Sequence, residues 1–163
     1  MLTSIADFIH YFASVRRRTI HFIEAVPADL LDWKPAEGEL SVTELIRHIT
    51  AAEIMFVTAV VEQRLYYQGH TPTDQSLAEL VAELNAHHQN MMIMLATMPD
   101  AVLNEHRIKL EGAPIRVWRW LLAMIEHEIH HRSQLAMYLT LNGITPPHIY
   151  GLGVEDVIAR ATG

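Results

Sequence analysis

The 163-residue sequence contains no cysteine. This absence excludes disulfide bonds, a thiol nucleophile and every thiolate metal site. Any metal ion that the chain binds must therefore be held by nitrogen and oxygen ligands. The 11 histidines, an unusual number beside that absence, are the obvious source of nitrogen ligands.

Positive charge is also scarce, since 12 Lys and Arg stand against 19 Asp and Glu, for a net charge of −7 with His neutral. This balance argues against sequence-independent binding to the phosphates of nucleic acids. The one basic cluster is Arg16, Arg17 and Arg18. Three consecutive helical residues point in three directions, so we expect a solvated face rather than a nucleic-acid patch.

Long apolar runs are missing as well. No segment offers 18 uninterrupted apolar residues, so the sequence predicts no membrane span. The N-terminal stretch lacks a positively charged region and is interrupted by Asp7 and His10, which argues against a signal peptide. We therefore expect a cytoplasmic protein without a membrane partner.

The remaining composition is that of a folded domain. Half of the residues are apolar and 19% are charged, which argues against disorder. A chain of this length favours one domain, residues 1–163, whose core needs no disulfide or metal to fold.

Apolar residues spaced by three and four predict four long amphipathic helices and a short terminal one. Capping boxes and Pro or Gly stops set most of their ends. Four such helices predict an all-α four-helix bundle. The link between the second and third holds about ten residues, enough for about 33 Å and hence for a crossover along the bundle. The predicted helices are about 4–26, 41–67 with Gly69 as the stop, 76–98, 115–142 and 154–161, with 106–110 extended.

Two histidines of the fourth helix, His127 and His131, are four residues apart and therefore share one face. With Glu128 they formally match the H-E-x-x-H pattern of zinc sites. Both imidazoles continue the core-facing stripe, where unpaired polar groups are costly. A shared metal ion would satisfy them, and so would hydrogen bonds within the core, so both interpretations stay open.

A third histidine, His48, has the same inward position on the second helix. Together with His127 and His131 it predicts a three-nitrogen site with open positions for water or substrate, which is the pattern of catalytic metal sites. Imidazole ligands suit zinc, nickel, iron, manganese or cobalt. We favour zinc or nickel, with one divalent ion per chain.

Four further residues are candidates for the pocket. Gln134, one turn beyond His131, is placed to orient a ligand or substrate, and Tyr138 and Trp120 are placed to wall the pocket. Glu128 points about 60° away from His131, which makes it a poor general base.

Other histidines and other metal chemistry rank lower. His88 lies on the apolar face of the third helix, and His130 lies beside the face of the fourth helix that carries His127 and His131. A zincin-type metalloprotease would need Gly at position 134 and His at 137, where the chain has Gln134 and Met137. The sequence thus disfavours a metalloprotease.

Three blocks of sequence resemble the DinB family, also described as DinB/YfiT-like. They are residues 35–53 with a Ser-capped helix and His48, residues 124–139 with an H-x-x-x-H-R-x-Q pattern, and the tail 142–153. Ser133 stands where the family often has Gly. The resemblance implies a four-helix bundle, a divalent metal on His48, His127 and His131, and commonly a homodimer. The positive mean hydropathy of +0.12 also favours a homodimer.

Family membership does not fix the chemistry, because its members include thiol-dependent S-transferases, isomerases and proteins without an assigned reaction. We expect a metal-dependent enzyme, either a hydrolase or a thiol S-transferase, acting on a small molecule. Since the chain has no Cys, any thiol must come from a low-molecular-weight cofactor. The alternatives are a non-catalytic metal-binding or stress-response dimeric protein, and a structural bundle without metal.

Overall fold

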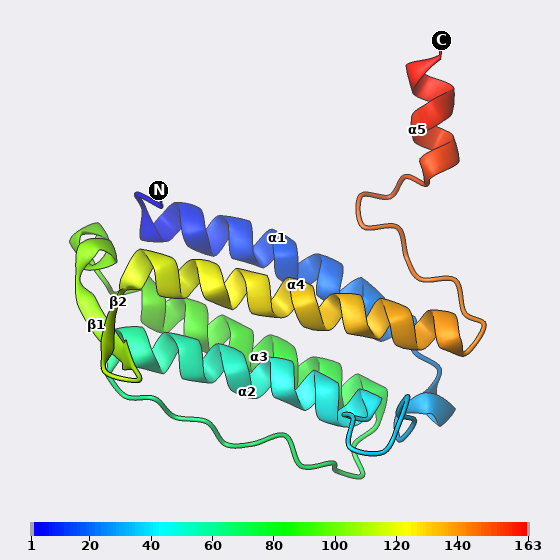
Figure 1. Ribbon diagram of the computed structural model, residues 1–163, viewed down its shortest axis with the longest axis horizontal. Helices are drawn as coiled ribbons and strands as arrows, with labels where there is room; N and C mark the ends of the chain where they lie inside the picture. Colours follow the sequence, from blue (N-terminus) through cyan, green and yellow to red (C-terminus); the bar gives the residue numbers. More distant parts are fainter. Residues whose placement is uncertain (1, 163) are drawn as a thin grey trace.

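The computed structural model describes residues 2–162 and consists of a four-helix bundle with two short additions (Figure 1). One addition is a β-hairpin at one end of the bundle, and the other is a short helix near the C-terminus. Two short 3-10 helices, 28–30 and 100–104, lie in the connections. The elements are α1 Ile5–Glu24, α2 Val42–Val61, α3 Leu77–Ala96, β1 His106–Leu110, β2 Ala113–Arg116, α4 Val117–Leu141 and α5 Val154–Ala161.

The bundle does not have a simple up-and-down topology. Helices α1 and α4 run in one direction and α2 and α3 in the other, so α2 and α3 are parallel (Figure 1). Parallel neighbours cannot be joined by a tight turn, and residues 62–76 cross the length of the bundle between them. The prediction of an all-α four-helix bundle with a crossover is thereby confirmed.

Serine side chains begin three of the long helices, as the sequence predicts. Ser41 and Ser76 each form a complete capping box with the glutamate three residues later. Ser4 accepts a hydrogen bond from the backbone N–H of Asp7 over 3.2 Å. These contacts fix where each helix starts and therefore which residues face the core.

The prediction that α2 continues to Tyr67 is wrong, because the helix ends at Val61. Gln63 has a left-handed backbone with φ 56°, which interrupts the helix, and Gly69 lies within the crossover. A helix advances only 1.5 Å per residue and extended chain more than 3 Å, so only extended chain returns along the bundle within this connection. The apolar residues 65–67 that continue the pattern are exposed on the crossover.

The fourth helix also starts later than expected. Residues 106–110 are extended as predicted, but they pair with Ala113–Arg116 in an antiparallel hairpin, and α4 begins at Val117 rather than at Ile115. Glu111 and Gly112 both have positive φ, which is typical of a tight hairpin turn. No helix of the described residues has the length and apolar character that crossing a bilayer requires.

The core divides into two apolar clusters with a polar layer between them. One cluster contains Phe8, Val57 and Leu121, and the other contains Phe22, Leu45 and Leu139. The layer in between brings together ionisable side chains from all four long helices, including His48, His127, His131, Arg16, Glu53, His88 and Glu128. Because buried polar groups need partners, this layer is where a functional site is expected.

Candidate metal centre

Three histidines of the polar layer converge as the sequence predicts. His48 comes from α2, and His127 and His131 come from one face of α4. The Nε2 atom of His127 lies 3.0 Å from Nε2 of His48 and 3.1 Å from Nε2 of His131. One ligand nitrogen from each ring lies within 4.8 Å of the other two. Two nitrogens bound to one zinc ion at about 2.05 Å in tetrahedral geometry are about 3.3 Å apart, so a small adjustment admits such an ion.

The protonation of one ring is set by its neighbour on α4. His131 Nδ1 lies 2.6 Å from Oε1 of Gln134. An amide oxygen only accepts hydrogen bonds, so the proton of neutral His131 is on Nδ1. The Nε2 atom of His131 therefore presents a lone pair to the centre of the cluster.

Hydrogen bonds among the three rings cannot give every Nε2 atom of the cluster a partner of its own. If His127 Nε2 carries a proton, that single proton has to serve both His48 and His131. If it does not, the lone pairs of His127 and His131 face each other at 3.1 Å. A cation at the point where the rings meet satisfies all three nitrogens, so the residues present fit a metal ion.

Electrostatics favour the neutral form that binds metal. Burial, followed by the neighbouring imidazoles, lowers the pKa of His127 to about 3 and that of His48 to about 4. Burial also lowers the pKa of His131. All three rings are therefore uncharged at neutral pH, with lone pairs available to a cation.

The crossover supplies a second layer around His48 that the sequence analysis did not identify. The hydroxyl of Tyr67 lies 2.7 Å from Nδ1 of His48 and 2.6 Å from Nδ1 of His70. When His48 uses Nε2 as a ligand, its proton is on Nδ1 and is donated to the Tyr67 oxygen, whose own O–H then donates to His70. These contacts fix both the orientation and the tautomer of His48.

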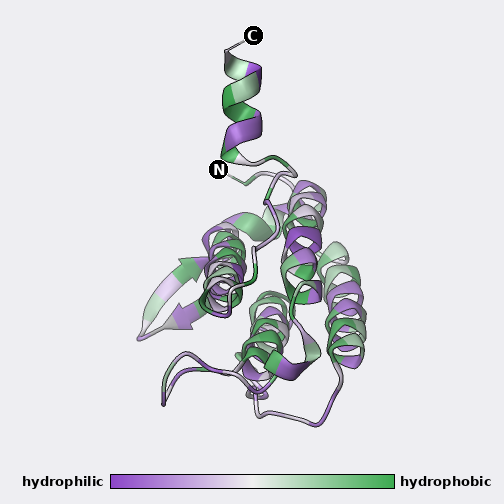
Figure 2. Cartoon of the chain, turned by 90° about the vertical axis from the view of Figure 1, so that its right-hand side faces the viewer, coloured by the Kyte–Doolittle hydropathy of each residue, from purple (hydrophilic) through white to green (hydrophobic). Residues whose placement is uncertain are grey.

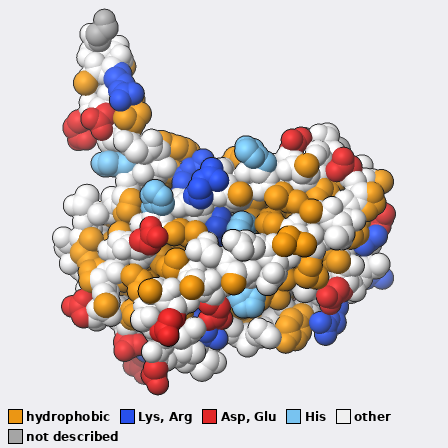
Figure 3. All heavy atoms as spheres, turned by 180° about the vertical axis from the view of Figure 1, so that it is seen from behind, with side chains coloured by type: hydrophobic (Ala, Val, Ile, Leu, Met, Phe, Trp, Pro, Cys, Tyr) orange, Lys and Arg blue, Asp and Glu red, His pale blue; other side chains and the backbone are white. Residues whose placement is uncertain are grey.

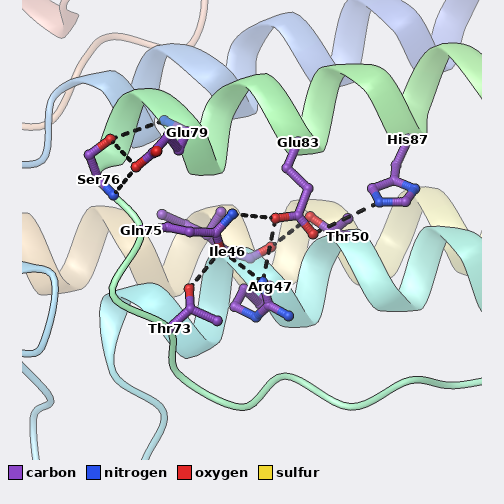
Figure 4. A network of polar contacts seen from close by, with 9 residues as sticks. All are labelled: Ile46, Arg47, Thr50, Thr73, Gln75, Ser76, Glu79, Glu83 and His87. Carbon is purple, nitrogen blue, oxygen red and sulfur yellow. Dashed lines mark hydrogen bonds and ion pairs between the residues drawn. The ribbon is translucent and has the colours of Figure 1, made fainter.

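The end of the crossover is tied to α2 and α3 by a polar network (Figure 4). Arg47 of α2 donates to Oε1 of Gln75 over 2.9 Å, and Gln75 donates to Glu83 of α3 over 2.7 Å. Thr73 donates to the same Gln75 oxygen over 2.6 Å. This anchoring limits where the preceding residues of the crossover, including Tyr67, can lie.

The aromatic candidates Trp120 and Tyr138 make backbone contacts. Trp120 donates from its indole N–H to the carbonyl of Phe56 over 2.9 Å, and Tyr138 donates to the carbonyl of Leu40 over 3.0 Å. Phe56, which the sequence analysis did not single out, places its ring 5.7 Å from the ring of His127 and 4.6 Å from that of Trp120. Trp120 thus supports Phe56, which is the aromatic neighbour of His127.

A buried ion cluster occupies the other side of the polar layer. Arg16 Nη2 lies 2.7 Å from a carboxylate oxygen of Glu53 and 2.7 Å from one of Glu128. His88 Nδ1 lies 2.7 Å from the second oxygen of Glu53. The predicted solvated face is therefore wrong for Arg16, which is 1% exposed because it neutralises carboxylates from α2 and α4. His88 belongs to this ion cluster, and Glu128 is engaged by Arg16.

A family model described as the DinB superfamily matches residues 11–135. The chain belongs to the DinB superfamily. This confirms the resemblance drawn from the three sequence blocks. A DinB relative from Bacillus subtilis strain 168, the uncharacterized protein YjoA, is 28% identical over 151 residues, which cover 88% of this chain and 94% of YjoA.

Three solved structures share the fold, and two of them are described as DinB-like. The crystal structure of YjoA from Bacillus subtilis superposes with a TM-score of 0.72 at 26% identity, covering 88% of this chain and 96% of YjoA. A DinB-like protein from Bacillus cereus ATCC 10987 gives 0.77 at 19% identity, covering 91% and 99% of the two chains. An uncharacterized protein from Clostridium difficile 630 gives 0.63 at 15% identity, covering 86% and 98%.

Proposed function

We propose that this DinB protein binds one divalent metal ion per chain through His48, His127 and His131. The observation that carries the proposal is the convergence of three neutral imidazoles whose nitrogens lie 3.0 and 3.1 Å from one another. Nitrogen ligands without thiolate favour zinc or nickel, with iron, manganese and cobalt as alternatives. Three protein ligands leave coordination positions open, as in catalytic rather than structural sites.

We further propose that the protein is a metal-dependent enzyme, either a hydrolase or a thiol S-transferase that acts on a small molecule. A bound divalent metal ion lowers the pKa of a water molecule or thiol and supplies a nucleophile near neutral pH. The chain's own contribution is to orient the ligands: Gln134 holds the Nδ1 proton of His131, and Tyr67 accepts that of His48. Because the chain has no Cys, the thiol of a transfer reaction would be an external small molecule.

One observation favours a second candidate, a non-catalytic metal-binding or stress-response protein. Glu128 is the carboxylate next to His127 in sequence, but it is buried against Arg16. In the described part of the chain, the group that can hold a metal consists of the three histidines, with no carboxylate among them. A general base for hydrolysis would then have to come from an imidazole, a hydroxyl or the substrate itself.

A turnover screen separates the two candidates. The metal-loaded protein is tested against esters and amides, and against electrophiles together with low-molecular-weight thiols. The enzyme proposal expects turnover in one of these classes, and expects it to disappear when a chelator removes the metal. Metal binding at one ion per chain without turnover in any class would favour the non-catalytic protein.

A Tyr67 variant tests whether the hydroxyl that contacts His48 strengthens metal binding. The variant Tyr67→Phe keeps the ring but loses the oxygen that contacts His48 and His70. We expect it to bind the metal about 10- to 100-fold more weakly, which is the usual effect of removing such a partner. Competition with a chelating dye measures the affinity of the protein.

The control for this variant is Tyr66→Phe, which removes the neighbouring hydroxyl that accepts a hydrogen bond from Gln68. It should leave metal affinity unchanged. Equal affinities for the two variants would show that the Tyr67 hydroxyl does not orient His48.

A further inference from the structure

A small cavity lies between the C-terminal half of α1 and the tail, residues 142–153, which passes along α1 before it reaches α5 (Figure 2). Its volume is about 280 Å³. Basic and histidine side chains gather beside the base of the tail (Figure 3). The lining consists of residues 148, 149 and 151 of the tail and of Ser14, Arg17, Arg18, His21 and Phe22 of α1. Positive and titratable groups thus surround this cavity in a chain whose net charge is −7.

The two arginines of the cavity have no carboxylate partner. In the part of the chain that the structure describes, neither Arg17 nor Arg18 forms an ion pair, whereas Arg16 binds Glu53 and Glu128. The lining of the cavity contains no acidic residue. An arginine that the protein does not neutralise keeps its fork of N–H donors available for an oxyanion from solution.

A third guanidinium lies behind the cavity. Arg132 of α4 is 7% exposed, and its Cζ atom lies 5.9 Å from the ring centre of Phe22, which lines the cavity. Its Nη1 atom is buried and has no hydrogen-bond partner among the described residues. The carboxylate nearest to it in the sequence of α4, Glu128, is bound by Arg16. Because solvent and salt screen a buried charge less than an exposed one, Arg132 makes the potential in the cavity more positive.

Local contacts bring the tail to the cavity. The N–H of Gly151 donates to the carbonyl oxygen of His148 over 3.1 Å and closes a turn. Within this turn, the ring centre of Tyr150 lies 5.5 Å from the guanidinium of Arg18. His148 from the tail and Arg18 from α1 therefore line the same cavity, and a ligand bound by both side chains would join the tail to α1.

We propose that this cavity binds a phosphate group. A phosphate carries a charge of about −1.5 to −2 and three strong acceptor oxygens, which suits two forked guanidinium groups better than the single charge of a carboxylate does. A water molecule's share of liquid volume is about 30 Å³, so the cavity also has room for an organic group bonded to the phosphate and packed on Phe22 and Ile149. The site shares no residue with the three-histidine cluster and does not depend on the proposed function.

Calorimetry of the full chain, without added metal and at constant ionic strength, tests the proposal with inorganic phosphate and with glycerol phosphate. We expect saturable binding of one phosphate group per chain, and the preferred probe tells whether the ligand is the free ion or an ester. Acetate should bind more weakly than either. The absence of saturable binding at millimolar concentration, or equally tight binding of acetate, would overturn the proposal.

The variants Arg17→Gln and Arg18→Gln each remove one charged donor from the cavity. Hydrogen bonds between charged groups are strong, so each variant should bind phosphate about 10- to 100-fold more weakly. Arg17 is exposed, so its loss should leave the fold intact. The matched control Arg119→Gln removes an exposed arginine near the start of α4 and should leave the affinity unchanged. Equal losses in all three variants would show that only net charge attracts the anion and would overturn the site.

Two further measurements locate the bound phosphate. His127→Ala should bind phosphate like the wild type, whereas phosphate held by a metal ion at the three histidines would be lost in this variant. Phosphate should also slow hydrogen exchange at residues 148–151, because the ligand joins the tail to α1. Loss of binding in His127→Ala, or unchanged exchange in the tail at saturating phosphate, would overturn the proposed location.

Discussion

The variant His127→Ala is expected to lose the metal ion. His127 is the central histidine of the cluster, since its Nε2 atom lies within 3.1 Å of those of both other histidines. Mutating a residue that orients a metal ligand weakens metal binding by up to about 100-fold, so removing a ligand itself should weaken it by more than about 100-fold. Elemental analysis should give about one divalent ion per chain for the wild type and essentially none for the variant.

Thermal stability offers a second readout of the same loss. A ligand present at about 1,000 times its dissociation constant stabilises the folded state by about 4 kcal/mol. Addition of a chelator should therefore lower the melting temperature of the wild type and leave that of His127→Ala unchanged. His130→Ala, which removes the neighbouring exposed ring, is the control and should behave like the wild type. Full metal content in His127→Ala would rule out the three-histidine site.

The variant Arg16→Ala is expected to lower the free energy of unfolding by about 3–5 kcal/mol, since it leaves buried carboxylates without their counter-charge. The arginine bridges Glu53 and Glu128, and all three side chains are buried. The adjacent Arg17→Ala removes an exposed arginine and should change stability by less than about 0.5 kcal/mol. Urea denaturation of both variants measures the difference.

The loss of unfolding free energy in Arg16→Ala should be larger at neutral pH than at acidic pH. Burial raises the pKa of Glu128, Arg16 lowers it, and Glu53 raises it. Without Arg16 the folded-state pKa lies further above the unfolded value, so the destabilisation is greatest at neutral pH and shrinks as the pH falls through that pKa. Glu128→Gln in the Arg16→Ala background should recover part of the stability. If Arg16→Ala lowers the free energy of unfolding only slightly at neutral pH, Arg16 does not neutralise these carboxylates.

The three histidines of the cluster could be predicted from the sequence because local residue spacing determines which side of a helix they occupy. His127 and His131 share a face through helix geometry alone, and His48 follows a Ser-capped start that fixes the register of its helix. The apolar pattern of each helix determines which side faces the core. Packing of α2 and α4 in one bundle then brings their core-facing histidines together.

Tyr67 and His70 were not accessible, because the crossover has no periodic pattern and its path depends on anchors such as Gln75 in other elements. Arg16 was misplaced for a related reason. Its position lies beside the apolar stripe of α1, but an arginine is buried only where carboxylates from distant helices meet it, and no local pattern shows Glu53 and Glu128 beside it.

The parallel arrangement of α2 and α3 also bears on how the chain folds. In an up-and-down bundle each pair of successive helices forms a hairpin with local contacts, which favours rapid folding. Here α2 and α3 meet only after the crossover has been laid along the bundle, and α1 packs against α4 from near the opposite end of the chain. Loop closure therefore precedes much of the stabilising contact, which places this bundle toward the slow end of the range for helical proteins.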